Sequence, residues 1–175
     1  MEVKQFNEKQ DTLVISGLHV AINRNERAIE DEENVKYEYD VEEFDVDKRE
    51  DIDKEVEAHM LFLLHEYDKS KAVNCFYLNN EPFWLDKATR VGLKLRFEAE
   101  KKANKTETIL WMSGFALSIL VDTGLQMLYQ LEIYASACYD CTAQHEANIK
   151  TLSRSIEKAE YDFTMGYPTK LSFVL

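Results

Sequence analysis

Two cysteines and a histidine are spaced in a way that could bind a metal ion. Cys138-x-x-Cys141-x-x-x-His145 puts three ligand types in one stretch of predicted helix, and zinc sites use thiolates and imidazoles. Cys138 and His145 are two turns apart, about 10.5 Å along a helix axis, whereas Zn–S and Zn–N bonds are only about 2.0–2.3 Å long. One ion could therefore take at most two of these side chains. We expect a stripe of core residues and no metal.

An acidic run from Asp45 to Glu55, DVDKREDIDKE, raises the question of a calcium loop. Such a loop starting at Asp45 would need an oxygen ligand at its fifth position, glycine at its sixth and glutamate at its twelfth. The chain has Arg49, Glu50 and Val56 there. We expect a solvated face and acids that complement the dipole of a helix N-terminus. The alternative is a docking surface for a basic partner, formed by Glu38, Asp40, Glu42, Glu43, Asp45 and Asp47.

Other catalytic patterns are missing from the sequence. It contains no G-x-S-x-G elbow, no phosphate-binding glycine loop and no G-x-G-x-x-G. His59 and His65 are six residues apart on a predicted helix, so they do not share a face well. We therefore predict no catalytic residue, no cofactor and no enzymatic activity.

The charge of the chain is concentrated in one region. The 175 residues include 33 acidic and 21 basic ones, a formal net charge of −12, and 15 of the acids lie between Glu30 and Glu57. Sequence-specific binding of nucleic acid is not expected, because phosphate neutralisation needs clustered Lys and Arg. The longest uncharged run, Thr108 to Val121, is shorter than the roughly 20 residues of a membrane span. Three cysteines form no disulfide framework, which indicates a reducing cytosol.

The elements predicted for residues 1–74 form a small antiparallel β-structure closed by one helix. The stretch 12–22 is rich in β-branched residues and predicts a strand or a strand pair around Gly17. Polar residues 23–33 predict a loop, and the alternation of residues 35–41 predicts a half-buried strand. From 49 to 69 the period changes to that of a helix, with one face made of Ile52, Val56, His59, Met60, Leu63 and Tyr67.

Residues 75–175 predict a second domain of two β-hairpins, each followed by a helix. Asn79-Asn80 and Ser113-Gly114 mark the hairpin turns, and Pro82 suits an edge strand. Asp86 is placed to cap a helix from Lys87 to about Ala103, with a stripe of Val91, Leu95 and Ala99. Asp122 is placed to cap a long helix, with apolar positions at Leu125, Leu128, Leu131, Ala135, Cys138, Thr142, His145, Ile149 and Leu152. The whole chain is thus predicted to be α+β.

The chain ends with a short predicted helix over 155–160 and an extended aromatic tail. Tyr161, Phe163, Tyr167 and Phe173 surround Gly166 in this tail. One interpretation is that the tail lies across the domain and holds the hairpins against the long helix. The other is that its aromatic side chains contact a neighbouring subunit, where they would supply a large contact area.

Several strings in residues 75–175 carry a resemblance to a known family. FYLNNEPFWLDKATRVGL, TETILW, LQMLYQLEIYASACYDCTAQHEANIKTL and YDFTMGYPTKLSF occur in matching order. They resemble a domain of unknown function found in tail and fibre regions of tailed bacteriophages and prophages. The landmark residues are Trp84, Asp86, Lys87, Arg90, Trp111, Tyr134, Tyr161, Asp162, Gly166, Tyr167 and Pro168. The N-terminal half carries no such resemblance.

The resemblance implies a structural protein of a tailed-phage virion, in the tail, at a fibre attachment or at the head–tail connection. Its implied partners are other phage structural proteins and further copies of itself, as a homo-oligomer in a symmetric assembly. It would be assembled in the cytoplasm of the host bacterium and would not act at a membrane. The alternatives are an assembly factor that is not retained in the particle and a small phage-encoded enzyme.

Overall fold

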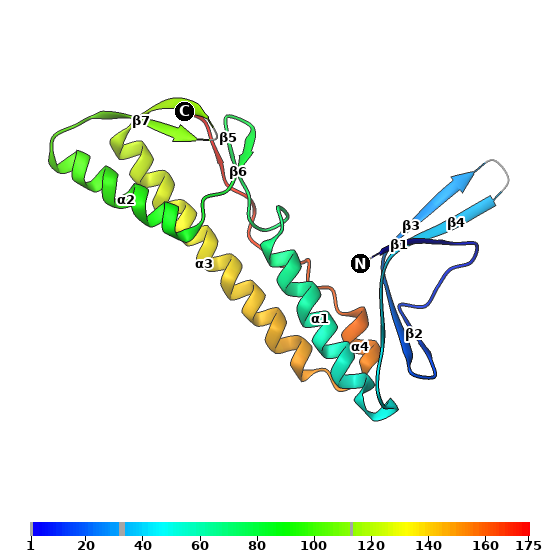
Figure 1. Ribbon diagram of the computed structural model, residues 1–175. Coiled ribbons are helices and arrows are strands. Elements are labelled where there is room, and N and C mark those ends of the chain that lie inside the picture. The colour runs from blue at the N-terminus through cyan, green and yellow to red at the C-terminus, as the bar shows by residue number, and fades with distance from the viewer. Residues whose placement is uncertain (1, 32–33, 113) are drawn as a thin grey trace. The chain divides into compact units, whose positions relative to one another are not determined.

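The computed structural model describes residues 2–31, 34–112 and 114–175. It confirms the predicted α+β class, with helices and antiparallel strands (Figure 1). The chain forms two compact units, each built from two stretches. Unit 1 comprises Met1–His65 and Gln144–Phe163, and unit 2 comprises Glu66–Ala143 and Thr164–Leu175. The predicted division between residues 74 and 75 separates the chain once, whereas in the structure the chain passes from one unit to the other three times.

Unit 1 contains a four-stranded antiparallel sheet in the order β1-β4-β3-β2. Its strands are β1 (Glu2–Phe6), β2 (Leu13–Ser16), β3 (His19–Asp31) and β4 (Asn34–Asp45). The strand pair predicted around Gly17 and the strand predicted over 35–41 are both confirmed. Gly17 has a φ of 69° in the turn between β2 and β3, a conformation that costs glycine little because it has no Cβ.

The prediction of a loop over 23–33 is wrong, because β3 continues to Asp31; residues 32–33 lie outside the described residues. Its polar residues pair across the sheet, as Arg27 does opposite Glu38. Opposite charges at facing positions stabilise an antiparallel pair, so this polar sequence forms a strand. A register shift between Arg24 and Arg27, with a φ of 55° at Asn25, marks a β-bulge. The bulge interrupts the alternation by which a strand is predicted.

The helices of unit 1 follow the predicted pattern. A 3-10 turn (Arg49–Asp51) precedes α1 (Ile52–Lys69), and α4 spans Ser155–Glu160. Both predicted helices are confirmed, as is burial on the predicted face of α1. The buried residues of α1 are Ile52, Val56, Met60, Leu63 and, beyond the prediction, Leu64.

Two basic side chains, Arg24, which is half-buried, and Lys158, which is buried, link the elements of unit 1. The guanidinium of Arg24 on β3 lies 4.4 Å from the ring centroid of Phe163 and donates hydrogen bonds to the carbonyl oxygens of Ala159 (3.4 Å) and Tyr161 (3.2 Å). The last carbonyls of a helix have no intrahelical donor, so Arg24 supplies one at the end of α4. Lys158 of α4 is buried and pairs with Glu57 of α1 at 2.6 Å.

Unit 2 contains a three-stranded sheet in the order β6-β5-β9. Its strands are β5 (Phe76–Leu78), β6 (Glu81–Phe83) and β9 (Ser172–Phe173). Asn79 and Asn80 have φ values of 51° and 68°, as the predicted two-residue hairpin turn requires. Pro82 lies on the edge strand β6, also as predicted. The C-terminal tail adds β9 parallel to β5.

The second hairpin, α2 (Lys87–Lys102) and α3 (Val121–Thr151) as far as Ala143 complete unit 2. The hairpin consists of β7 (Glu107–Met112) and β8 (Phe115–Leu120). Of the predicted turn, Gly114 has a φ of 86°, and Ser113 lies outside the described residues. The prediction that Asp122 caps α3 is wrong, because α3 already begins at Val121. Asp122 lies in the first turn and pairs with Lys101 at 2.7 Å.

The predicted buried stripe of α2 is wrong. Val91 is 47% exposed and Leu95 is 62% exposed, and Ala99 is also exposed. Arg90 and Phe97 are the buried residues of this helix. Two rows of side chains at helical spacing run along α2, and hydropathy alone predicts burial of the row that contains no arginine. Contacts with the rest of unit 2 bury the arginine instead.

Helices α2 and α3 approach closely where Phe97 meets Gly124. Both residues are buried, and a Cβ added to Gly124 would overlap the ring of Phe97, with Cδ2 only 2.9 Å away. Phe97 belongs to the main core of unit 2, with residues such as Phe76, Leu110 and Leu131. The glycine therefore sets the distance at which α3 packs against α2.

We predict that Gly124→Ala lowers the free energy of unfolding by about 1–3 kcal/mol, the usual cost of overpacking a core. The measurement is urea unfolding followed by circular dichroism. Gly92→Ala is the matched control, since a Cβ at Gly92 meets nothing within 4 Å. Alanine there should leave stability unchanged or raise it by about 0.4–1 kcal/mol. Equal stability of the two variants would contradict the packing described here.

Candidate functional site

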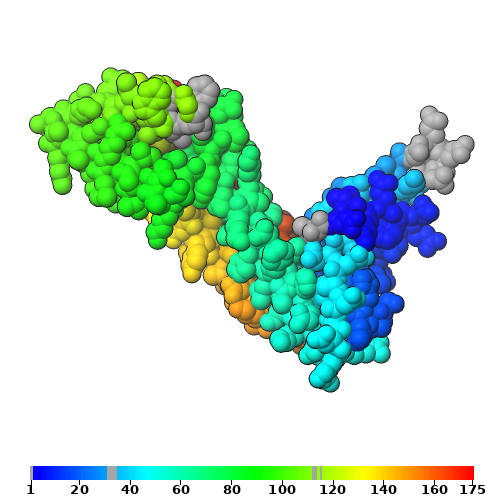
Figure 2. All heavy atoms as spheres, in the orientation of Figure 1, coloured from blue at the N-terminus to red at the C-terminus, as the bar shows by residue number. Residues whose placement is uncertain are grey.

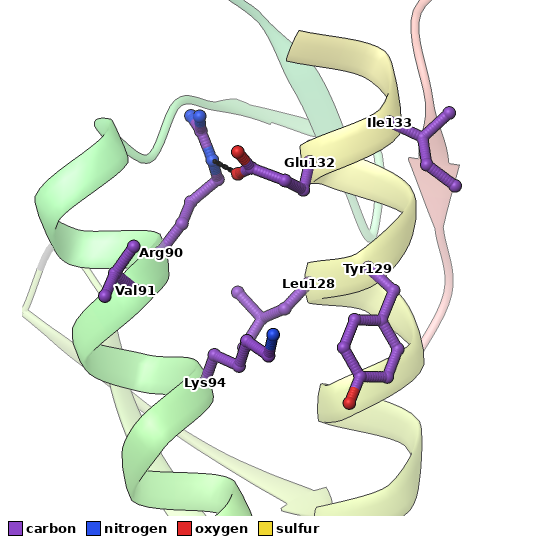
Figure 3. A pocket seen from close by; sticks show the side chains of 7 residues that line it. All are labelled: Arg90, Val91, Lys94, Leu128, Tyr129, Glu132 and Ile133. Carbon is purple, nitrogen blue, oxygen red and sulfur yellow. Dashed lines mark hydrogen bonds and ion pairs between the residues drawn. The ribbon is translucent and has the colours of Figure 1, made fainter. Parts of the chain in front are cut away.

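A groove of about 330 Å³ lies between α2 and α3 in unit 2 (Figure 3). The α2 side contributes charged and apolar residues, and the α3 side contributes apolar residues and one acid. The lining residues are Arg90, Val91, Lys94, Leu128, Tyr129, Glu132 and Ile133.

The start of α2 positions the charged end of the groove. Asp86 is the N-cap, and its carboxylate accepts hydrogen bonds from the backbone N–H of Thr89 (2.8 Å) and from the hydroxyl of Thr89 (3.0 Å). These bonds hold the pKa of Asp86 below its usual value. The predicted cap is thus confirmed, and it places Arg90 one turn further along α2.

Arg90 is buried, and its Nε and Nη1 groups both donate hydrogen bonds. Its Nη1 donates to the carbonyl oxygen of Leu85 (2.7 Å), and its Nε donates to Oε2 of Glu132 (2.9 Å). The guanidinium also lies 5.4 Å from the ring centroid of Trp84. Burying a charge is costly unless it is paired and hydrogen-bonded, and here both conditions are met. Figure 3 shows the Arg90–Glu132 pair closing one end of the groove.

The rim of the groove is apolar and open to solvent. Ile133 is 71% exposed and Tyr129 is 40% exposed on α3, and Val91 is 47% exposed on α2. The ammonium group of Lys94 lies 5.3 Å from the ring centroid of Tyr129. A concave apolar surface with a few fixed charges suits the binding of a side chain from another molecule. Among its lining residues there is no nucleophile beside a general base.

Of the landmark residues, Trp84, Tyr134 and Tyr167 support the interior of unit 2. The Trp84 and Tyr134 rings meet edge to face at 6.4 Å, and the Tyr134 hydroxyl donates to the carbonyl oxygen of Val73 at 2.7 Å. Burial raises the pKa of Tyr134, so it stays a donor. The hydroxyls of Tyr167 and Thr142 are 2.8 Å apart. These motif residues are structural.

The other motif residues occupy different surroundings. Gly166 has a φ of 84° in the turn of the tail, and Pro168 beside it is half-buried. Lys87 is exposed in the first turn of α2, and Trp111 on β7 is 70% exposed. The motif therefore does not converge on one site.

Tyr161 and Asp162 belong to unit 1, where Asp162 is exposed. The Tyr161 hydroxyl is 2.7 Å from Nδ1 of His145 and accepts a hydrogen bond from Asn148 at 2.9 Å. His145, the third residue of the possible metal site, thus contacts Tyr161 within unit 1.

The two cysteines of that site lie in unit 2, Cys138 buried and Cys141 half-buried. Loss of hydration on burial raises the pKa of both thiols. Burial thus favours the protonated thiols, and a zinc ion would have to displace their protons to bind them. Among residues 2–31, 34–112 and 114–175, no group of three or more His, Cys, Asp or Glu is arranged to hold a metal ion.

The acids predicted as a partner surface do not share one face. Successive side chains of a strand point to opposite faces, so Glu38, Asp40 and Glu42 lie on one face of β4, and Glu43 and Asp45 on the other. Asp47 follows the strand.

Most of these acids are paired within unit 1. Arg27 binds Glu38 (2.7 Å) and Asp40 (2.8 Å), Lys4 binds Glu43 (2.5 Å), and His19 lies 2.9 Å from Asp45. The Arg27 hydrogen bond is the main cause of the lowered pKa of Asp40. For Glu38, the bond from Gln5 comes first and that from Arg27 second. These pairs stabilise the sheet and leave less free charge for a basic partner.

The division of the chain into units also divides its charge. Unit 2 holds 10 acidic and 10 basic residues, so its net charge is zero. Unit 1 holds 23 acidic and 11 basic residues and carries the whole net charge of −12. The groove thus lies in the neutral unit.

Sequence reasoning missed the groove as a site. The available signal was on α2, where Val91 and Leu95 compete with the stripe that contains Phe97. A helix can bury one such stripe against its own domain, and the second remains for another molecule. Glu132 and Ile133 gave no separate signal, because their side chains meet the groove only through the packing of α3 on α2.

Comparisons with known proteins identify no relative: no family model, curated protein or solved structure matches the chain. None of the helices in the described part of the chain is long and apolar enough to cross a membrane. The site must therefore be interpreted from its own residues.

We predict that Arg90→Ala lowers the free energy of unfolding by about 1–3 kcal/mol, because it leaves the buried carbonyl of Leu85 without a donor. Urea unfolding measures the change. Glu132→Gln is the control, since the amide still accepts the Arg90 hydrogen bond and the half-exposed ion pair contributes less than about 1 kcal/mol. If Arg90→Ala were no more destabilising than Glu132→Gln, the role given to Arg90 would be wrong.

We predict a pH-dependent effect of Arg27→Gln. The lowered pKa values of Glu38 and Asp40 contribute stability that is present above their ordinary pKa values and is lost as the pH falls through the lowered ones. The variant should have a lower urea midpoint than the parent chain at pH 7, and the difference should shrink toward about pH 3. Arg49→Gln removes the same charge from unit 1, and no ion pair of Arg49 is found among the described residues. A constant difference for Arg27→Gln from pH 7 to pH 3 would contradict the pairing.

Proposed function

We propose that this protein is a structural component of a tailed-phage particle and acts by docking onto other virion proteins. It would occupy the tail, a fibre attachment or the head–tail connection, in repeated copies. The observation that carries the proposal is the open apolar groove between α2 and α3. The groove lies in the unit that contains most of the landmark residues of the resemblance to the phage domain.

The surface of unit 2 supports this assignment. Large apolar side chains are exposed on α2, on the β7–β8 hairpin and on the groove side of α3, namely Val91, Leu95, Ile109, Trp111, Leu120, Tyr129 and Ile133. Exposed apolar side chains mark an interaction site where they gather around a concave surface, as Val91, Tyr129 and Ile133 do at the groove. Figure 2 shows α2 and the β7–β8 segment, in green to lime, on the visible surface of unit 2.

Charge supports the same division of roles. Unit 2 has no net charge, so its own residues add no excess like charge to a contact with another protein. In unit 1, Glu38, Asp40 and Glu43 of the acidic strand are paired with Arg27 and Lys4 of the same sheet. We therefore assign docking to unit 2 and leave the acidic strand as a structural element of unit 1.

We predict that mass spectrometry of purified particles of the encoding phage finds this chain at a fixed ratio to the tail proteins. Absence from particles, with presence in the infected lysate, would refute a structural role and favour an assembly factor. Absence of a phage genome context would refute both.

We further predict that Ile133→Asp lowers incorporation at least about tenfold, which corresponds to a loss of about 1.4 kcal/mol in docking free energy. Incorporation is measured by the same mass spectrometry after complementation of a phage that lacks the chain. Tyr139→Asp is the matched control, because Tyr139 is 73% exposed on the same helix and does not line the groove. Equal incorporation of both variants would exclude the groove as the docking site.

A further inference from the structure

The outer edge of β8 is an unpaired strand edge. The hairpin β7–β8 is a separate two-stranded sheet, and the hydrogen bond from Val121 N–H to the Thr106 carbonyl (2.9 Å) fixes its pairing pattern. Hydrogen-bonded and non-hydrogen-bonded pairs alternate along an antiparallel ladder. The backbone groups of Ala116 and Ser118 therefore point away from β7.

The two edges of this hairpin differ. On the β7 edge, Nη2 of Arg96 donates to the outward carbonyl of Ile109 at 3.0 Å. On the β8 edge, no hydrogen bond in the described part of the chain reaches the outward backbone groups of Ala116 or Ser118, and both residues are exposed. A two-stranded sheet is marginal alone, and an open edge is a template for another strand. The outward N–H and C=O groups of this edge can therefore pair with an extended backbone segment of another molecule.

We propose that β8 pairs antiparallel with β8 of a second copy of this chain, about a twofold axis at Ser118. In this register Ser118 faces Ser118 of the second copy, and Ala116 faces Leu120 of the second copy. All three positions have outward backbone groups by the alternation of the ladder. The hairpins of two copies then form one continuous four-stranded sheet.

The side chains favour a second copy as the occupant. β8 has no charged residue, so pairing β8 with β8 of a second copy places no like charges of these strands opposite each other. Leu120, 57% exposed, would lie against the small Ala116 of the other copy and beside its exposed Trp111. The edge strand β1 is less suited, because it belongs to the unit that carries all of the net charge.

The contact is small for a dimer in dilute solution. Pairing of a few residues buries less than the roughly 1,200 Å² of a standard stable interface, so association should depend on protein concentration. Repetition in a particle raises the effective concentration of each contact. The inference deepens the proposed function by naming a self-association surface, but it needs only the chain itself for its test.

The first test compares Ser118→Pro with Ser118→Ala by sedimentation equilibrium of the full chain over a wide concentration range. Proline removes the outward N–H at an edge position and leaves the β7–β8 ladder intact, whereas alanine keeps the N–H and removes only the hydroxyl. The parent chain and Ser118→Ala should dimerise, and Ser118→Pro should dimerise at least about tenfold more weakly. A parent chain that is monomeric throughout, or equal association of both variants, would overturn the proposal.

The second test is disulfide trapping, which decides the matter if Ser118→Pro alters the circular dichroism spectrum. Facing residues of a hydrogen-bonded antiparallel pair have Cα atoms about 5.5 Å apart, within the range of about 4.4–6.8 Å that a disulfide spans. Ser118→Cys should form a covalent dimer on mild oxidation. Ser136→Cys, also exposed in unit 2, and the parent chain with its own cysteines should not. Equal trapping at both positions, or none at Ser118, would overturn the pairing.

These results separate the inference from the proposed function. If the chain forms the trapped dimer but is absent from particles, the virion role is refuted and the self-association stands. If the chain is present in particles but monomeric in both tests, the self-association is refuted and the virion role stands.

Discussion

The close approach of α2 to α3 at Gly124 is the constraint on which unit 2 depends. The ring of Phe97 occupies the space that a side chain at residue 124 would fill, and this brings the two helices close enough to bury Arg90 between them. Once Arg90 is buried it must be satisfied, and the Leu85 carbonyl and Glu132 do so. The groove is the surface left outside this contact. The β7–β8 hairpin is held beside it through Arg96, which binds Thr108 and Ile109.

The sequence predicted the elements better than it predicted their exposed faces. Asn79-Asn80, Gly114 and the Asp86 cap act locally, through backbone conformation and hydrogen bonds to near neighbours, so their positions follow from the sequence alone. The strand over 23–31 was missed because its stabilising partners, such as Glu38 for Arg27, lie across the sheet. The choice between the two stripes of α2 depends on Gly124, which is far away in sequence. No local rule could supply that contact.

The same limit applies to the candidate sites. Cys138, Cys141 and His145 and the acidic strand attracted attention because their residue types are chemically distinctive. In the structure, buried protonated thiols and cross-strand ion pairs account for most of these groups. The groove and the β8 edge consist of ordinary apolar side chains and backbone groups, which become distinctive only when the fold leaves them uncovered. They are the two surfaces of the neutral unit that we propose for assembly, the groove for a side chain and the β8 edge for a strand.

We propose that unit 2 is an assembly module. A cryo-microscopy map of the purified phage particle at side-chain resolution tests this proposal directly. The account predicts density for this chain with the α2–α3 groove occupied by a neighbouring protein and with β8 beside β8 of a second copy. A map in which the chain is present with both the groove and the β8 edge facing solvent would contradict it.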